Sequence, residues 1–144
     1  MARDDPFELI RFVEAQDPVF EAVQAELSAG RKRTHWMWFV FPQIAGLGRS
    51  PMAQAYAIGS LDEASAYLAH PVLGPRLIEC VRLVNAVPNC SAHDIFGSPD
   101  DMKFRSCLTL FGQVSEEEIF PRALNRYFDG IADPLTIEAL LSQA

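Results

Sequence analysis

Apolar residues recur at helical spacing along most of the chain. Between Pro18 and Gly30 they return every three or four positions, which is typical of one buried face of a helix. The segment from Pro71 to Pro88 shows the same pattern. No segment shows a convincing alternation of apolar and polar residues. The spacing predicts further helices over residues 60–69, 99–111, 115–128 and 133–141.

Six prolines follow a residue that can mark a helix start. Asp and Ser side chains accept hydrogen bonds from the free N–H groups there, and proline fits the first helical position because its missing N–H would be unpaired anyway. Asp-Pro and Ser-Pro pairs also open turns, so the pattern that follows each pair decides. Ser115, three residues before Glu118, predicts a capping box for a further helix. The six pairs are Asp5-Pro6, Asp17-Pro18, Ser50-Pro51, His70-Pro71, Ser98-Pro99 and Asp133-Pro134.

The apolar run Trp36–Phe41 fits either a buried strand or a buried helical turn, because periodicity cannot decide for so short a run. With helices expected on every side and no partner strand in view, we expect a helix that ends before Pro42. The run is far too short to cross a bilayer, which takes about 20 apolar residues. The sequence therefore predicts an all-α fold, with residues 1–144 forming one compact domain of about seven or eight short helices.

The composition fits a globular protein. Hydrophobic residues make up 49% of the chain, enough to form a core. The net charge of −7 argues against general nucleic-acid binding, because duplex binding depends on cations that neutralise phosphates. The three cysteines are an odd number and do not suggest a disulfide framework. No apolar signal core follows the N-terminus, so we expect a soluble cytoplasmic protein without a membrane anchor or cofactor.

One segment departs from the acidic composition, because residues 27–61 contain no Asp or Glu. The segment holds Trp36, Trp38 and a glycine-bearing loop that leads to a helix start at Ser50. Basic side chains, flexible glycines and a helix N-terminus together suggest an anion site. The loop is not a P-loop, since it lacks the Lys-Ser/Thr ending, and both tryptophans could instead belong to the core. The cations of the segment are Arg31, Lys32, Arg33 and Arg49.

Four further residues have side chains suited to catalysis or ligand binding. His35 lies among cations, which would keep its imidazole neutral and able to act as a base. Asp100, Lys103 and Ser106 are spaced to share one face of a helix, where the lysine could bind phosphate or activate a hydroxyl. The alternatives are that His35 has a structural role and that Asp100, Lys103 and Ser106 form a solvated helix face. One Cys and one His within residues 90–94 fall short of the three or four ligands of a zinc site, so we expect no metal.

Several motifs are distributed along nearly the whole chain, beginning with HWMWFVFPQ at His35–Gln43. The further motifs are Gly46-Leu47-Gly48, Ser50, Tyr56-Ala57-Ile58, Glu63-Ala64, Tyr67-Leu68, His70-Pro71, Arg76-Leu77, Ile95-Phe96-Gly97, Asp100, Lys103, Ser106 and Thr109-Leu110-Phe111. Together they resemble the hallmark motifs of the domain-of-unknown-function 1810 family. The resemblance implies an all-α fold and no established activity. Where the family often has Ser-Ser-Met-Thr, this chain has Ser106-Cys107-Leu108-Thr109, which puts a role for a second hydroxyl in doubt.

Two classes of function follow from these observations. In the first, the protein binds a small anionic ligand, phosphorylated or nucleotide-like, in a basic aromatic pocket, with a hydrolase or glycosidase as the most concrete enzymatic form. His35, Lys103 and Asp100 are then the catalytic candidates. In the second, the basic aromatic segment is a protein interface without catalytic activity. The ligand-binding candidates are Arg31, Lys32, Arg33, Trp36, Trp38, Gln43, Arg49, Ser50 and Ser106.

Overall fold

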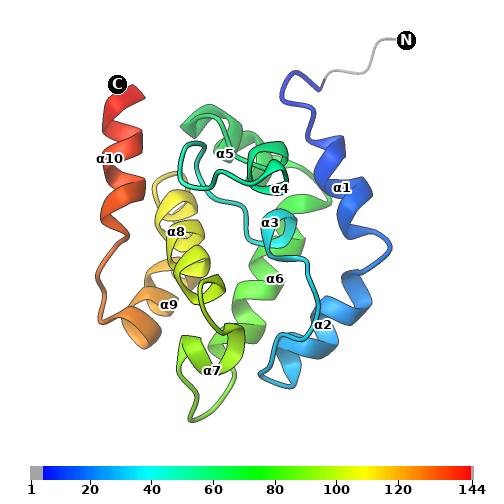
Figure 1. Ribbon diagram of the computed structural model, residues 1–144, viewed down its shortest axis with the longest axis vertical. Helices are drawn as coiled ribbons and strands as arrows, with labels where there is room; N and C mark the ends of the chain where they lie inside the picture. Colours follow the sequence, from blue (N-terminus) through cyan, green and yellow to red (C-terminus); the bar gives the residue numbers. More distant parts are fainter. Residues whose placement is uncertain (1–4, 144) are drawn as a thin grey trace.

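The computed structural model describes residues 5–143, which fold into ten α-helices (Figure 1). Within these residues the β pairing is limited to one isolated bridge between Ile44 and Ile58. The prediction of an all-α fold is therefore confirmed. The helices are α1 (Ile10–Gln16), α2 (Phe20–Ser28), α3 (Met37–Val40), α4 (Pro51–Ala55), α5 (Leu61–Ala69), α6 (Leu73–Asn85), α7 (Ala92–Phe96), α8 (Asp100–Gly112), α9 (Ile119–Phe128) and α10 (Pro134–Gln143).

The expected number of seven or eight helices is too low. Helices α3, α4 and α7 have only four or five residues each, too few to display a helical period in the sequence, and only α3 and α4 were expected, from the apolar run before Pro42 and from the Ser50-Pro51 pair. Helix α7 went unpredicted, although it begins with a complete capping box. The Ser91 hydroxyl accepts a hydrogen bond from Asp94 N at 3.0 Å, and the Asp94 carboxylate accepts one from Ser91 N at 3.0 Å.

Two of the predicted helix starts form as expected. The Ser50 hydroxyl accepts a hydrogen bond from Ala53 N at 3.1 Å, and Pro51 occupies the first position of α4. The Asp133 carboxylate accepts a hydrogen bond from Thr136 N at 3.0 Å in the first turn of α10. Local side-chain caps therefore fix these two helix starts, as the sequence predicts.

Two other predicted caps do not form. The Asp17 carboxylate accepts a hydrogen bond from the Arg76 guanidinium of α6 at 2.9 Å instead of capping α2. The Ser115 hydroxyl accepts from Glu117 N at 3.0 Å, and α9 begins only at Ile119, so the predicted capping box is wrong. In the first case a distant partner takes the capping side chain. In the second, residues 115–117 are irregular and the helix begins only after them.

Helices α6 and α8 supply much of the core. Helix α6 contacts α2, α5 and α9, while α8 contacts α5, α7, α9 and α10. Gly74 lets α5 and α6 approach closely, because a Cβ there would lie 2.1 Å from the Leu68 carbonyl oxygen. Phe104 of α8 packs against Phe41 and Phe96, with ring centroids 5.0 and 4.7 Å apart. This aromatic cluster joins α7 and α8 to the end of α3, which lies within the acid-free segment of residues 27–61.

The peripheral helices flank this core on opposite sides (Figure 1). Helices α1 and α2 lie along one side, and α10 lies along the other, where it contacts α8. Among the helices of residues 5–143, none combines the length and hydropathy needed to cross a bilayer.

Candidate functional site

The acid-free segment of residues 27–61, called the basic segment from here on, leaves α2 through a Schellman turn at Gly30. Gly30 N donates to the Leu27 carbonyl at 3.0 Å, and Arg31 N donates to the Glu26 carbonyl at 3.0 Å. Gly30 has a positive φ of 75°, and a Cβ there would lie 2.8 Å from Cγ1 of Val87. The glycine that predicts the end of α2 therefore also sets the direction in which the basic segment leaves it.

A single carboxylate, that of Glu26, organises the segment that follows. Glu26 Oε1 accepts hydrogen bonds from Arg33 N at 2.8 Å, Thr34 N at 3.1 Å and Trp36 Nε1 at 2.9 Å, and Oε2 accepts from the Thr34 hydroxyl at 2.7 Å. Burial by itself would raise the pKa of Glu26, but these hydrogen bonds outweigh it and lower the pKa to about 2. The loop is thus held by a carboxylate that stays ionised at neutral pH.

Two lysines from distant parts of the sequence meet at Asp100. The ammonium of Lys32 lies 3.0 Å from Asp100 Oδ2, and that of Lys103 lies 3.6 Å from Oδ1. Each lysine also lies over a tryptophan ring: Lys32 is 5.1 Å from the Trp36 ring centroid, and Lys103 is 5.3 Å from that of Trp38. The cluster holds two positive charges and one negative charge, which leaves one positive charge in excess.

A narrow crevice opens beside Lys103. Its volume is about 10 Å³, roughly the space that one water molecule needs. Among residues 5–143, neither the Lys103 ammonium nor the Gln43 side-chain amide takes part in an intramolecular hydrogen bond, and the 3.6 Å contact of Lys103 with Asp100 is an ion pair too long for one. Both groups therefore have free donors beside the crevice. Its lining is Met37, Trp38, Phe41, Gln43, Ala53, Tyr56 and Lys103.

The structure brings six of the predicted residues into this region and divides the two tryptophans between different roles. Trp36 is 1% exposed and belongs to the core, whereas Trp38 is half-buried and lines the crevice. The other four residues belong to the lysine cluster or line the crevice. The six residues are Lys32, Trp36, Trp38, Gln43, Asp100 and Lys103.

The other predicted residues lie outside the crevice. The Ser106 hydroxyl is buried and donates to Asp133 Oδ2 at 3.0 Å, so it faces the start of α10 rather than Lys103. His35 is exposed on the loop between α2 and α3 and is not part of the crevice lining. The expected meeting of His35, Asp100 and Lys103 at one cavity is therefore not seen. The remaining four residues are exposed at the surface: Arg31, Arg33, Arg49 and Ser50.

Sequence reasoning missed Glu26 and Tyr56. Tyr56 lines the crevice and packs at a tilt against Phe39, with ring centroids 5.4 Å apart. Its place in the family motif Tyr56-Ala57-Ile58 was the available signal. Glu26 immediately precedes the acid-free segment, and nothing in the local pattern shows that its carboxylate turns back onto residues 33–36.

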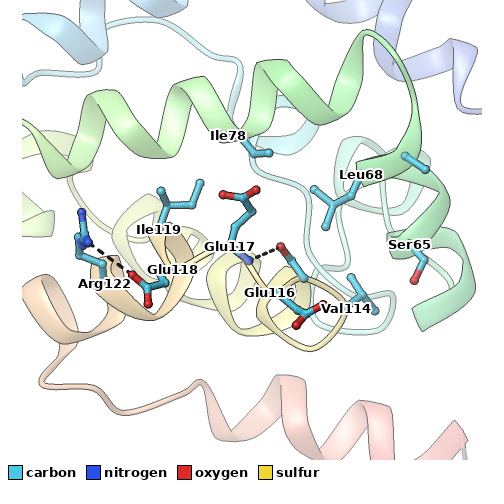
Figure 2. Close-up of a pocket in the computed structure, with 11 residues that line it drawn as sticks. Ser65, Leu68, Ile78, Val114, Glu116, Glu117, Glu118, Ile119 and Arg122 are labelled. Carbon is cyan, nitrogen blue, oxygen red and sulfur yellow. Dashed lines mark hydrogen bonds and ion pairs between the residues drawn. The ribbon is translucent and has the colours of Figure 1, made fainter.

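A much larger hollow lies elsewhere and has the opposite charge. Figure 2 shows it between α6 and the segment that leads into α9, with a volume of about 680 Å³. Glu116, Glu117 and Glu118 contribute to its lining, together with apolar side chains of α5, α6 and α9. This hollow differs from the expected basic pocket in both charge and position.

The described residues also include three free cysteines, of which Cys80 and Cys107 are buried and Cys90 is half-buried. Within residues 5–143, no three His, Cys, Asp or Glu side chains come together as a metal-binding group.

Comparisons with known proteins give a family and a solved structure of the same fold. A family model described as "Protein of unknown function (DUF1810)" matches residues 6–140. The crystal structure of the conserved hypothetical protein Rv1873 from Mycobacterium tuberculosis is 54% identical in sequence, with a TM-score of 0.94, over 95% of this chain and 99% of that chain. No curated protein matches the sequence. The described protein is itself hypothetical, so the likeness brings no activity with it.

Proposed function

The chain belongs to the DUF1810 family of proteins of unknown function, and from that premise we propose that it binds a small anionic ligand, phosphorylated or nucleotide-like, at the crevice formed by Trp38, Gln43 and Lys103. One observation carries the proposal. Lys103 and Gln43 line the same crevice with donors that make no intramolecular hydrogen bond, and an ammonium with an amide N–H₂ suits an anionic oxygen.

The lysine cluster supports Lys103 as the group that meets the ligand. Asp100 lies closer to Lys32, at 3.0 Å, than to Lys103, at 3.6 Å. Lys32 can therefore retain the carboxylate while Lys103 turns to a ligand. Asp100 is a positioning residue in this arrangement, because it is absent from the crevice lining. The exposed Arg31 and Arg33 add positive potential that would attract an anion.

The size of the crevice limits how a ligand can bind. With space for about one water, the crevice accepts a single oxygen or small group, and the rest of a ligand would lie over its mouth. Half-buried Trp38 and Tyr56 offer planar surfaces there, which suits a ligand that carries an aromatic ring. A nucleotide has both the anionic group and the ring.

Binding is better supported than hydrolysis. Glycoside hydrolysis generally needs two carboxyl groups that flank the scissile bond. The crevice lining contains neither a carboxylate nor His35, the expected base. The alternative of an aromatic protein interface is also weaker here, because Trp36, Phe39 and Phe41 are buried in the core. The three free cysteines fit a cytoplasmic location, which we include in the proposal.

The test combines ligand-induced stabilisation with tryptophan fluorescence. Thermal melts against nucleotides, ADP-ribose and sugar phosphates should show an increase in Tm for the matching ligand, since a ligand that binds the native state stabilises it. The same ligand should change the emission of the protein. Trp38 lies at the crevice and Trp36 is buried against Glu26, so Trp38→Phe should remove the change.

Two variants that each lose one positive charge separate the site from the overall charge. Lys103→Met keeps the aliphatic stem and removes the ammonium, and it should weaken binding about ten-fold or more, in line with a lost charge-assisted hydrogen bond. Arg82→Met, on the exposed face of α6, should bind like the wild type. Equal weakening in both variants, or no stabilisation by any compound in the panel, would reject the proposed crevice.

A further inference from the structure

The hollow in Figure 2, called here the acidic groove, has a floor of apolar side chains. Leu68 comes from α5, Ile78 from α6, and Val114 and Ile119 from the segment that enters α9. All four are partly buried, and Leu68, Val114 and Ile119 pack on the core while still presenting surface to the groove. The floor is therefore a built apolar strip, available to a side chain of a partner.

The rim of the groove carries unpaired negative charge. Glu118 lies 3.8 Å from the Arg122 guanidinium, a contact within one turn of α9. Among residues 5–143, neither Glu116 nor Glu117 takes part in an ion pair, and both are exposed. In Figure 2 the Glu117 carboxylate extends into the gap between its own segment and α6, toward Ile78. Two carboxylates without an ion-pair partner thus lie on the segment beside the apolar floor, and that of Glu117 extends towards it.

The groove continues along α6 into a second hollow of about 560 Å³. Leu68 and Ile78 line both hollows, and Gly74 and Pro75 extend the lining toward the start of α6. Glu79 and Arg82 also line this hollow, and they are paired with each other at 2.8 Å. Leu68 and Ile78 therefore join the two hollows into one apolar strip along α6.

We propose that the acidic groove binds a basic segment of a partner protein. Lys or Arg side chains of that segment pair with Glu116 and Glu117, and an intervening aliphatic side chain packs on Leu68 and Ile78. Carboxylates beside an apolar strip are complementary to a peptide that carries both cationic and aliphatic residues. The groove shares no lining residue with the crevice at Lys103, so this site is independent of the anion site.

The shape of the groove favours a peptide over a small cation. Ligand pockets that hold small molecules enclose most of the ligand surface. The acidic groove is open to solvent between α6 and the 114–119 segment (Figure 2), so a small polyamine would remain mostly hydrated. A peptide gains from the apolar floor as well as from the carboxylates.

Fluorescence anisotropy with designed peptides tests the proposal. The probe is a fluorescein-labelled peptide, GKSLKRLKSG, and its partner is GKSSKRSKSG, which has the same charge and no Leu. The first peptide should bind more tightly than the second, because only the first can pack on the floor. The double variant Glu116→Gln, Glu117→Gln should weaken binding of the first peptide about five-fold or more, as expected for two partly exposed charge pairs.

A charge-matched control locates the effect. The double variant Glu14→Gln, Glu138→Gln removes two exposed carboxylates from α1 and α10, and it should bind the first peptide like the wild type. Equal weakening in the two double variants would mean attraction to net charge and would overturn the proposal. Equal binding of the two peptides, or displacement of the first by spermine at the same concentration as by unlabelled peptide, would mean a general polycation surface and would also overturn it. Absence of binding would do the same.

Discussion

At the scale of single residues, Glu26 connects the ionisation of one side chain to the order of a loop. Its pKa is about 2 in the folded protein, below the ordinary value of 4.5, so the folded state favours the ionised form. The resulting stability is present above the ordinary pKa and is lost as pH falls from about 4.5 towards 2. The linked contribution is on the order of 3 kcal/mol at most, from 1.36 kcal/mol per pKa unit.

The variant Glu26→Gln should therefore lower the free energy of unfolding at pH 7 and flatten its dependence on pH between about 4.5 and 2. The amide keeps the shape of the side chain but places an N–H₂ group opposite N–H and O–H donors that need an acceptor. We expect the free energy of unfolding to fall by about 1–3 kcal/mol. Urea denaturation at several pH values measures both effects. Glu21→Gln, on an exposed site of the same helix, is the control. An unchanged pH slope in Glu26→Gln would contradict this role.

At the scale of elements, Asp133 shows how one cap fastens a peripheral helix. Its Oδ2 accepts hydrogen bonds from Thr136 N at 3.0 Å, the Thr136 hydroxyl at 2.6 Å and the Ser106 hydroxyl at 3.0 Å. Asp133 N donates to the Thr109 hydroxyl at 2.8 Å, so α8 binds both the carboxylate and the backbone N–H of this residue. The first turn of α10 thus depends on a buried polar network rather than on its cap alone.

Removing this carboxylate by Asp133→Ala should cost about 2–3 kcal/mol, because a cap is lost and buried donors are left unpaired. Hydrogen exchange should rise first at the amides of α10, and chemical denaturation gives the total loss. Asp133→Asn is the matched variant, since it keeps an acceptor of nearly the same shape and should lose less. Equal losses in the two variants would show that the cap does not hold the helix.

The helix starts also show how far the sequence alone could predict the fold. Ser50 and Asp133 cap helices through bonds to residues three positions ahead, and such local bonds can be recognised in a sequence. Asp17 has the same local pattern, but Arg76 of α6 takes its carboxylate, and no local rule includes a partner so distant along the chain. Local chemistry therefore predicts a cap only where tertiary contacts leave the side chain free.

The contacts of the candidate site also divide into local ones, which the sequence predicts, and distant ones, which it does not. The contact between Asp100 and Lys103 spans three positions of one helix and was predictable from spacing. The contact between Lys32 and Asp100 joins two segments far apart in the sequence, and it depends on the packing of α7 and α8. The position of Ser106 depends on tertiary packing in the same way, because a helix position faces the neighbour that packs on it, and the Ser106 hydroxyl meets Asp133 at the start of α10.

At the scale of the whole molecule, folding redistributes the charge that the sequence lays out. The acid-free segment has four cations and no acid, but Glu26 and Asp100 from outside it turn their carboxylates towards it. The basic surface is consequently weaker than the linear sequence implies. Negative charge gathers instead beside the acidic groove, so the two proposed sites differ in sign as well as position.

The cysteines allow a test of the global packing. Burial raises the pKa of the Cys80 thiol to about 12 and that of Cys107 well above its ordinary value, so both remain protonated and unreactive in the folded protein. Cys90 is half-buried. A thiol reagent at pH 8 should therefore modify Cys90 in the native protein and all three cysteines in urea, as mass spectrometry of peptides would show.

The rate of modification then reports how the core opens. Cys80 lies on α6 and Cys107 on α8, and these helices contribute to one core, so the two thiols should become reactive together as urea is raised. In a Cys90→Ser variant the native protein should take up no reagent, which makes the global opening directly visible. Reaction of Cys107 well before Cys80 would show that α8 can separate from the core while α6 stays packed, and would contradict a single cooperative core.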